Sequence, residues 1–593
     1  MHGMLKGALA LAIALGTFEA QAQNADLILY NAKVFTAEPG QPLQQAIAVA
    51  GGKVLQVGSN EDIRKLAGSG SKQVDLGGKV LMPGFIDSHS HSIFGGLELI
   101  SASLQDEQMD LDAFEKRLKQ DRDSGKAKVH DSVVMNGMNS TYWSQADGLA
   151  KRFNQGEWKD TPVVLIGSDH HTAWANAAML KRAGLDAKRV RGLSPLEQQN
   201  VAHDKDFNPS GFLVDSGFDL VAAAMPVPDA ATMDRAGMAA VKYNNSLGIT
   251  AWMDPAANGT PGEALFAIKP TEKTVGVLPV YRDLARDGQL TAHVAALQVV
   301  NPRSTPADLD VIEKVRQQFQ GIPNLTLPGI KVFADGVIEF PAQSAALLED
   351  YKNSHKPGEL LIDPKHFGEL VSAADARGWL VHIHAIGDRA VRESLNGFAQ
   401  ARKDRQSGVT HSITHLQLVN PKDFPRFKEL GVIASMQLDW AAAEPYTVEL
   451  VKPYIADETY RYMYPAKSLL DNGATIAGAS DWPVSTPDPL KAIYQAVTRK
   501  GEEGVLNAAE RVDRQTMFYA YTRNAAQTIG LSDKIGTLAA GKQADMVVLD
   551  RDVFTVPDQQ LDEARVLHTL FEAAKSTAPT INRLSEPGSC AGV

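Results

Sequence analysis

Short apolar runs recur along the chain, and most of them end at polar residues. One run extends from Val80 to Ile86, and seven more follow at residues 248–254, 290–297, 329–335, 378–388, 409–418, 431–437 and 474–481. The segments between these seven runs are long enough for helices. Alternation of strands and helices is typical of a parallel sheet, and eight repeats predict an α/β fold built on a closed (β/α)8 barrel.

The two ends of the chain carry a different pattern. Residues 26–80 contain short β-like runs with Gly51-Gly52 and Gly77-Gly78 at turn positions, and GTLAAGKQADMVVLD near the other end has the same character. We therefore expect a small β-sandwich domain formed by residues 23–80 together with 535–575. The barrel domain would then occupy residues 81–534.

The segment from about 97 to 235 interrupts the barrel pattern. One strand–helix unit of such a barrel averages about 30 residues, and this segment is several times longer. Because it follows the first strand, it would lie over the mouth of the barrel. We expect it to form a cap that shapes the substrate pocket.

Both termini have compositions that suggest no enzymatic role. Lys6, an apolar run and a small-residue site before Gln23 predict a Sec-type signal peptide over residues 1–22, cleaved after Ala22. The protein would then be periplasmic or secreted. Residues 576–593 are expected to form a flexible tail, and they contain the sole cysteine, Cys590, so no disulfide within the chain can form.

Composition narrows the class of partner. The 593 residues are 44% hydrophobic and 22% charged, as in ordinary globular proteins, and 59 basic against 70 acidic residues leave a net charge of -11. This balance argues against nucleic acid as a partner. Apart from the signal region, no apolar run is long enough for a membrane anchor. A small-molecule substrate is expected, and a homo-oligomer is compatible with the sequence.

Two histidines directly follow the first barrel strand, in the run GFIDSHSH. His89 and His91 are two residues apart, so in an extended backbone both side chains lie on one face and can reach the same ion. The alternative is a pair of solvated loop histidines.

Further candidate ligands follow at later strand ends. They are Lys331, His384, His415 and Asp481. The 31 residues from His384 to His415 correspond to about one strand–helix unit, so these groups would converge at one mouth of the barrel. His382 lies on the same strand face as His384, and alternation alone does not distinguish the two.

The motifs around these residues resemble those of the amidohydrolase superfamily, in particular its YtcJ-like branch, amidohydrolase family 3, which includes N-substituted formamide deformylases. The matching motifs are PGFIDSHSH, SDHHTAWAN, GIKVFADG, HAIGDRAV, THLQL, GASDWPV and GTLAAGKQADMVVLD. They extend from about residue 26 to residue 570. The HAIGD match favours His384 over His382 as the ligand.

The resemblance implies a site with two divalent metal ions, usually zinc. His89, His91 and Asp481 would hold one ion, His384 and His415 the other, and Lys331, carboxylated by carbon dioxide, would bridge them. Asp481 would also act as general base and then as general acid. Two alternatives remain: a single-metal site formed by His89, His91, His384 and Asp481, and an unmodified Lys331 in a salt bridge.

Four residues are candidates for substrate binding. His171 and Trp174 lie in SDHHTAWAN, Trp143 precedes them in NSTYWSQ, and Trp482 follows Asp481. They would line an aromatic pocket under the cap. Packing in the core of the inserted segment is the alternative.

The sequence therefore predicts an exported, metal-dependent hydrolase that cleaves an amide-like C–N bond in an N-acyl, N-formyl or cyclic amide. An ester or lactone hydrolase, or an isomerase, could use the same site because the fold does not determine the reaction. A periplasmic protein that binds a small molecule without catalysis is the alternative from another class.

Overall fold

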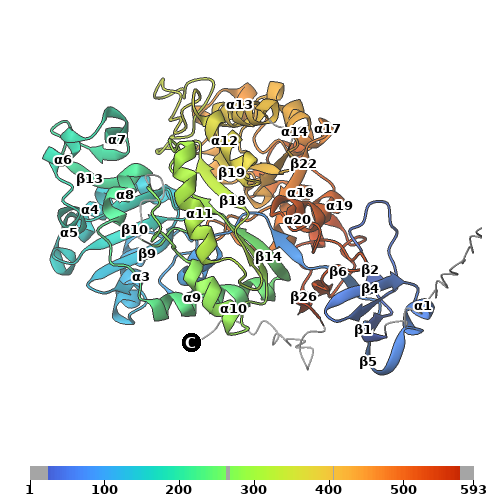
Figure 1. Cartoon of the computed structure of the whole chain (residues 1–593). Helices are drawn as coiled ribbons and strands as arrows, with labels where there is room; N and C mark the ends of the chain where they lie inside the picture. Colours follow the sequence, from blue (N-terminus) through green and yellow to red (C-terminus); the bar gives the residue numbers. More distant parts are fainter. Residues whose placement is uncertain (1–23, 262–267, 405–406, 574–593) are drawn as a thin grey trace, which may run out of the picture.

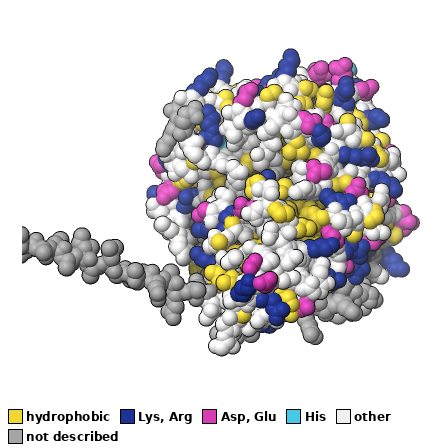
Figure 2. Space-filling view, turned by 90° about the vertical axis from the view of Figure 1, so that its right-hand side faces the viewer, with side chains coloured by type: hydrophobic (Ala, Val, Ile, Leu, Met, Phe, Trp, Pro, Cys, Tyr) yellow, Lys and Arg dark blue, Asp and Glu magenta, His cyan; other side chains and the backbone are white. Residues whose placement is uncertain are grey.

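The protein is described here from a computed structural model covering residues 24–261, 268–404 and 407–573. The predicted signal peptide and the whole predicted tail lie outside these residues and stay predictions. Within the described part, no helix is both long and apolar enough to cross a membrane. On the face shown in Figure 2, basic and acidic side chains are intermingled.

The centre of the molecule is formed by parallel strands in two sheets (Figure 1). One sheet has the order β17-β15-β14-β7, with bounds Leu325–Thr326, His293–Ala296, Ile249–Asp254 and Phe85–Asp87. The other has the order β16-β18-β19-β20-β21-β22, with bounds Gln298–Val299, Gly329–Phe333, Leu380–Ala385, His411–His415, Val432–Met436 and Thr475–Gly478. Each of the eight predicted segments contains a strand of these sheets.

The two sheets adjoin one another along the chain and through hydrogen bonds. β15 is followed after one residue by β16, and β17 is followed after two residues by β18. At the other edges, the Ser88 amide and hydroxyl both donate to the Gly478 carbonyl, at 3.0 and 2.8 Å. The first and last strands therefore meet just beyond their carboxyl ends.

Helices cover the outside of these strands. They are α9 (Ala230–Ser246), α10 (Leu278–Arg286), α11 (Leu309–Gln318), α12 (Phe367–Ala376), α13 (Asp388–Asp404), α14 (Phe424–Leu430), α17 (Ala466–Asp471), α18 (Pro489–Thr498), α19 (Arg514–Tyr519) and α20 (Ala525–Thr528). The strands are buried along almost their whole length, as expected for a parallel sheet covered by helices.

The run Val80 to Ile86, predicted as one strand, is divided in the structure. β6 (Val80–Pro83) belongs to a sheet of the terminal domain, and only β7 belongs to the central strands. Gly84 lies between them, where a Cβ atom would be 2.2 Å from the Thr250 hydroxyl oxygen. This close approach to β14 requires glycine and lets the chain pass from one sheet to the other.

The two ends of the described chain meet in two small sheets. One has the order β4-β3-β1-β5 (Lys53–Gly58, Ala46–Ala50, Ala25–Tyr30 and Ala67–Asp75), and the other β2-β6-β25-β26 (Lys33–Val34, Val80–Pro83, Met546–Leu549 and Val566–Leu570). β6 pairs with β25 antiparallel, with Met82 opposite Val547. Apolar side chains of both sheets, including Leu27, Ile47 and Met546, share one buried cluster.

The inserted segment has a sheet and cores of its own. Its sheet has the order β12-β13-β11-β10-β9-β8, with bounds Val201–His203, Pro209–Val214, Thr172–Ala175, Val163–Gly167, Ser132–Met138 and Lys128–Val129. Its helices include α3 (Leu111–Asp123), α4 (Ala146–Phe153), α5 (Ala177–Arg182) and α8 (Ser216–Ala222). We call the residues between α2 and α9, 101–229, the cap; its sheet lies to the left of the central strands in Figure 1.

Helix α2 (Ser92–Ile100) leads from β7 into the cap and packs closely against α9. A Cβ atom at Gly96 would be 2.0 Å from the Ala236 carbonyl oxygen, and one at Gly95 would be 2.5 Å from the Trp482 ring. Both glycines therefore allow the close contact that fixes α2 beside the central strands.

Candidate functional site

The structure brings all six predicted metal-site residues to one cavity of about 690 Å³. The six are His89 and His91 after β7, Lys331 in β18, His384 in β19, His415 at the end of β20, and Asp481 after β22. In α/β folds with parallel strands, functional groups gather at or near the carboxyl ends of the strands, and these residues follow that rule.

Asp481 is at the centre of this group. One of its carboxylate oxygens, Oδ1, lies 3.1 Å from His89 Nε2 and 3.3 Å from His91 Nε2, and its Oδ2 lies 3.8 Å from His415 Nδ1. Its side chain is 10% exposed. A buried carboxylate therefore faces three imidazole nitrogens.

Two of these nitrogens are unsatisfied. Among the described residues, His89 Nε2 and His415 Nδ1 are buried and have no partner in hydrogen-bond geometry. Buried polar nitrogens of this kind are rare unless an ion or water contacts them. Ligand atoms of His89, His415 and Asp481 all lie within 4.8 Å of one another, so these three residues could hold a metal ion.

The distances also suit a metal. Zinc binds histidine nitrogen and carboxylate oxygen at about 2.0–2.2 Å in tetrahedral geometry, which separates neighbouring ligand atoms by about 3.3–3.5 Å. The 3.1 and 3.3 Å separations from Asp481 Oδ1 to the His89 and His91 nitrogens are close to that range. The residues present therefore fit a divalent ion.

The charge states of these groups match those of metal ligands. Burial, aided by the Lys331 charge, lowers the pKa of His89 to about 3. Burial also holds the pKa values of His384 and His415 well below their usual range. Burial alone would raise the pKa of Asp481, but His89, His91 and His415 together lower it well below its usual value. Neutral imidazoles and an ionised carboxylate are the forms that bind metal.

His382 lies behind His89. Its Nε2 is 2.6 Å from His89 Nδ1, and its own Nδ1 is 2.6 Å from the Ser412 hydroxyl. It is fully buried and does not line the cavity. His382 therefore orients His89, as residues behind a metal ligand commonly do. Of the two histidines in β19, His384 faces the cavity.

His384 is held by the loop that follows β18. Its Nε2 donates to the Gly336 carbonyl at 3.1 Å, so Nδ1 is the nitrogen left for a metal. Its ring centre is 4.4 Å from that of His415. His384 is outside the compact group of His89, His415 and Asp481, so the division of the ligands into two sets stays a prediction.

Lys331 is 1% exposed, and its ammonium nitrogen lies 4.9 Å from the centre of the Phe333 ring. Within the described part of the chain, no carboxylate forms a salt bridge with it, so the salt-bridge alternative is not observed. Burial lowers the pKa of Lys331 to about 7, against the opposing effect of Asp481. Its carboxylation stays a prediction.

The backbone around the site is unusual and well fixed. His415 and Asp481 have φ values of 77° and 59°, a region that residues other than glycine seldom adopt and that is enriched at functional sites. Asp87 accepts hydrogen bonds from the Ser480 hydroxyl at 2.5 Å and from the His89 amide at 3.1 Å. It thereby ties the loop carrying Asp481 to the loop carrying the histidines.

The cap contributes a histidine–aspartate pair. His171 Nδ1 lies 2.7 Å from Asp215 Oδ1, and the His171 ring centre is 5.2 Å from that of His384. Burial lowers the pKa of His171, but Asp215 outweighs burial and raises it above its usual value. A Cβ atom at Gly336 would be 2.5 Å from Asp215 Oδ2. Gly336 therefore leaves room for the cap to dock beside the metal-site histidine.

The three predicted substrate-binding tryptophans are not among the residues that line this cavity. Trp143 and Trp174 lie in the cap core, 4% and 0% exposed, and Trp143 Nε1 donates to the Thr172 hydroxyl at 2.8 Å. Trp482 packs against Tyr243, with ring centres 5.3 Å apart. Large aromatic side chains serve cores as readily as pockets, and sequence alone did not separate the two. His171 does line the cavity.

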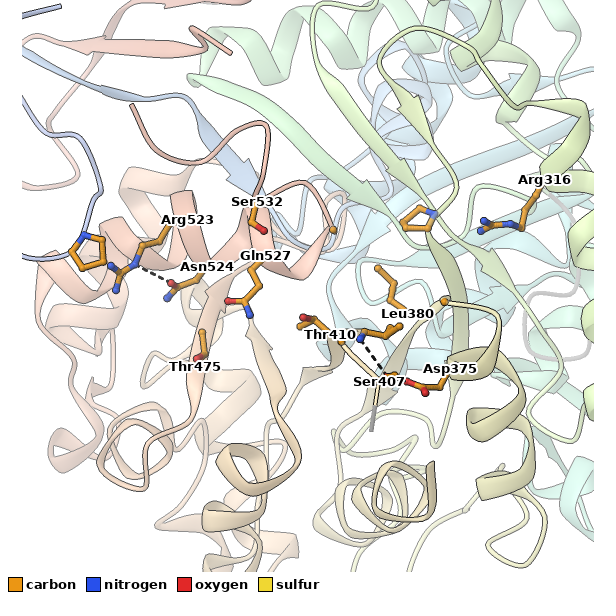
Figure 3. Close-up of a pocket in the computed structure, with 16 residues that line it drawn as sticks. Arg316, Asp375, Leu380, Ser407, Thr410, Thr475, Arg523, Asn524, Gln527 and Ser532 are labelled. Atoms are coloured by element: carbon orange, nitrogen blue, oxygen red, sulfur yellow. Dashed lines mark hydrogen bonds between the residues drawn. The ribbon is translucent and has the colours of Figure 1, made fainter. Parts of the chain in front are cut away.

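A second cavity, of about 1060 Å³, lies at the opposite ends of the strands (Figure 3). Its lining includes Leu380 and Thr475, which begin β19 and β22. Asp375 in its wall accepts hydrogen bonds from Ser407 and from His411 Nε2. These polar groups join α12 to β20, so they have a structural role, and His411 also stacks on Phe398 with the ring centres 4.9 Å apart.

Comparison with known proteins identifies the family. A model described as "Amidohydrolase family" matches residues 72–572. The chain belongs to the amidohydrolase family. This confirms the resemblance noted in the sequence.

Curated amidohydrolase-family relatives span nearly the whole chain. Protein LONG AFTER FAR-RED 3 of Arabidopsis thaliana is 29% identical over 537 residues, which cover 88% of this chain and 87% of the relative. N-substituted formamide deformylase of Arthrobacter pascens is 24% identical over 564 residues, 93% and 98% of the two chains. A solved structure from Pyrococcus horikoshii OT3, titled an uncharacterized metal-dependent hydrolase, is 25% identical with a TM-score of 0.69, covering 90% and 99%.

Three residues near the site had not been identified from the sequence. Asp215 and Ser412 orient His171 and His382, and Trp440 stacks on His415 at 5.7 Å with the ring planes 7° apart. Each acts through a contact between elements far apart in the chain. Ser412 does lie in the predicted strand that carries His415, but serine is too common in strands to indicate a contact with a metal-site residue.

We expect His382→Ala to weaken binding of divalent metal by about 10- to 100-fold, the effect typical of losing a group that orients a metal ligand. Metal affinity measured by competition with a chelating dye tests this. His366→Ala, at a side chain that is 69% exposed, is the control. Unchanged affinity in the His382 variant would show that His89 does not depend on His382.

Proposed function

We propose that the protein is an exported, metal-dependent hydrolase that cleaves an amide-like C–N bond in a small molecule. The observation that carries the proposal is the buried group of His89, His415 and Asp481 at the floor of a cavity, in a chain of the amidohydrolase family. Export rests on residues 1–22 alone, and a mature chain beginning at Gln23 is the expected product.

We also propose that the eight central strands form a closed (β/α)8 barrel. The hydrogen bonds from Ser88 to the Gly478 carbonyl, and the Asp481 amide donating to the His89 carbonyl at 2.8 Å, support this closure. The likeness to the Pyrococcus horikoshii structure is consistent with it. Closure explains how groups from strands far apart in sequence reach one site.

In this proposal the site holds two divalent ions, with zinc the expected metal. His89, His91 and Asp481 would hold one ion, His384 and His415 the other, and a carboxylated Lys331 would bridge them. Burial and the lack of an observed salt bridge make Lys331 suitable for this modification. Bound ions supply activation of water and polarisation of the substrate carbonyl.

In this proposal, Asp481 carries out the proton transfers of the reaction. Asp481 accepts a proton from the attacking water, whose oxygen bonds to the carbonyl carbon. As the C–N bond breaks, Asp481 returns this proton to the leaving nitrogen, so water and amide become a carboxylic acid and an amine. The low pKa of Asp481 keeps it ionised for the first step.

His171 is the proposed polar contact from the cap to the substrate. It lines the cavity beside His384, and Asp215 fixes which ring nitrogen faces the protein. Since Asp215 belongs to the cap and Gly336 to the loop after β18, this contact also couples cap docking to substrate binding.

We predict that Asp481→Asn lowers kcat by about 10²- to 10⁴-fold, because the amide cannot carry the proton. Turnover of a panel of N-formyl, N-acyl and cyclic amides by the metal-loaded protein tests this. Asp562→Asn, on the surface, is the control. Full turnover by the Asp481 variant would contradict its catalytic role, and ligand binding without turnover in the wild type would favour a binding protein.

We predict that His171→Gln and Asp215→Asn each lower kcat/KM by about 10- to 100-fold, the range for losing a hydrogen bond to a charged group. Because the two residues act as a unit, the double variant should be no worse than either single one. Steady-state kinetics on the same amide measure the effect. Additive losses, or losses matched by His130→Gln at the mouth, would argue against the pair.

A further inference from the structure

One face of helix α2 forms an apolar wall of the cavity. Phe94, Leu97 and Ile100 are spaced three residues apart, so they lie along one side of the helix, and all three line the cavity. The opposite side of α2 carries Gly95 and Gly96, which hold the helix against Trp482 and α9. The packing of α2 therefore fixes this wall without any contact from a ligand.

The cap supplies the facing apolar wall. Four apolar residues of the cap line the cavity. Ile166 belongs to β10, Phe218 and Ala222 lie one turn apart on α8, and Met225 follows that helix. Ile166 belongs to a buried cluster of the cap, against which Phe218 and Met225 pack. Two apolar surfaces from different parts of the chain thus border the space above the metal-site residues.

Acidic side chains within this space are engaged by the protein itself. Glu98 accepts a hydrogen bond from the Ser103 hydroxyl and lies 3.5 Å from His170 Nε2. Asp169 accepts hydrogen bonds from the amide and hydroxyl of Thr172. The lining also includes the basic side chains of Lys126, Lys128 and Arg235, and the apolar surfaces of α2 and the cap share the cavity with the metal-site residues.

Apolar side chains also continue out to the mouth. Ile100 and Val227 are 37% and 53% exposed, and they are two of the six exposed large hydrophobic residues in the described part of the chain. Val227 lies between Pro226 and Pro228, both of which line the cavity. Apolar surface gathered at an opening commonly marks a ligand-binding groove.

We propose that the substrate carries a long aliphatic or bulky aromatic group, which lies between α2 and the cap while the scissile amide reaches the metal-site residues. The position of the scissile bond rests on the proposed function, whereas the apolar site does not. A cavity of about 690 Å³ accommodates a ligand of this size.

Binding of straight-chain 1-alkanols from butanol to decanol to the full chain, by isothermal titration calorimetry, tests the apolar site without any reaction. Affinity should rise about fourfold per methylene, the gain expected for burying each one, until the space between the walls is filled. Ala222→Phe should shorten the longest chain that gains affinity, and Leu97→Asn should reduce the gain per methylene. Leu43→Asn, an exposed apolar residue outside the cavity, is the control.

Hydrolysis of N-formyl alkylamines of the same lengths separates this inference from the proposed function. We expect kcat/KM to rise with chain length in parallel with alkanol affinity. Length-dependent binding without hydrolysis would keep the apolar site and reject the hydrolase. Hydrolysis of short amides with no effect of length, or with dependence only on a terminal carboxylate, would overturn the apolar site and keep the hydrolase.

Discussion

A buried carboxylate surrounded by imidazoles is the constraint on which the site depends. Asp481 lies close to His89, His91 and His415. Burial lowers the pKa values of His89 and His415, while the pKa of Asp481 lies well below its usual value and the carboxylate stays ionised. A charge of this kind is costly to bury unless it is compensated. Burial lowers the pKa of Lys331 to about 7, and the proposed divalent metal would satisfy both the carboxylate and the buried nitrogens of His89 and His415.

The proposed function assigns the chemistry to the strand ends and the choice of substrate to the cap and α2. Strand ends and their supporting contacts, Asp87 to Ser480 and His382 to His89, hold the metal-site groups in place. The cap and α2 instead provide the walls of the cavity. His171 joins the two parts, since its ring faces His384 while Asp215 fits over Gly336. A change in the cap could therefore alter the substrate without altering the metal site.

Much of the site was predictable because it depends on periodicity. The position of His89 and His91 after an apolar run predicted that both reach one site, and they do so from the loop after β7. The spacing of strand–helix units likewise predicted that His384, His415 and Asp481 meet at one mouth. Contacts between distant elements were not predictable in this way. The close approach of Thr250 that divides Val80 to Ile86 at Gly84, the packing of Trp143 in the cap core and the pairing of Asp215 with His171 all depend on tertiary distances. Sequence periodicity indicates on which side of a strand or helix a residue lies, but it does not indicate which distant residue it contacts.

The most direct test is the metal content of the purified full chain, measured by inductively coupled plasma mass spectrometry together with amide hydrolysis. We predict stoichiometric divalent metal in the wild type, loss of activity when a chelator removes it, and recovery when it is restored. The double variant His89→Gln, His91→Gln should fold but bind less metal. A metal-free wild type that hydrolyses amides at the full rate would contradict the role assigned to these residues.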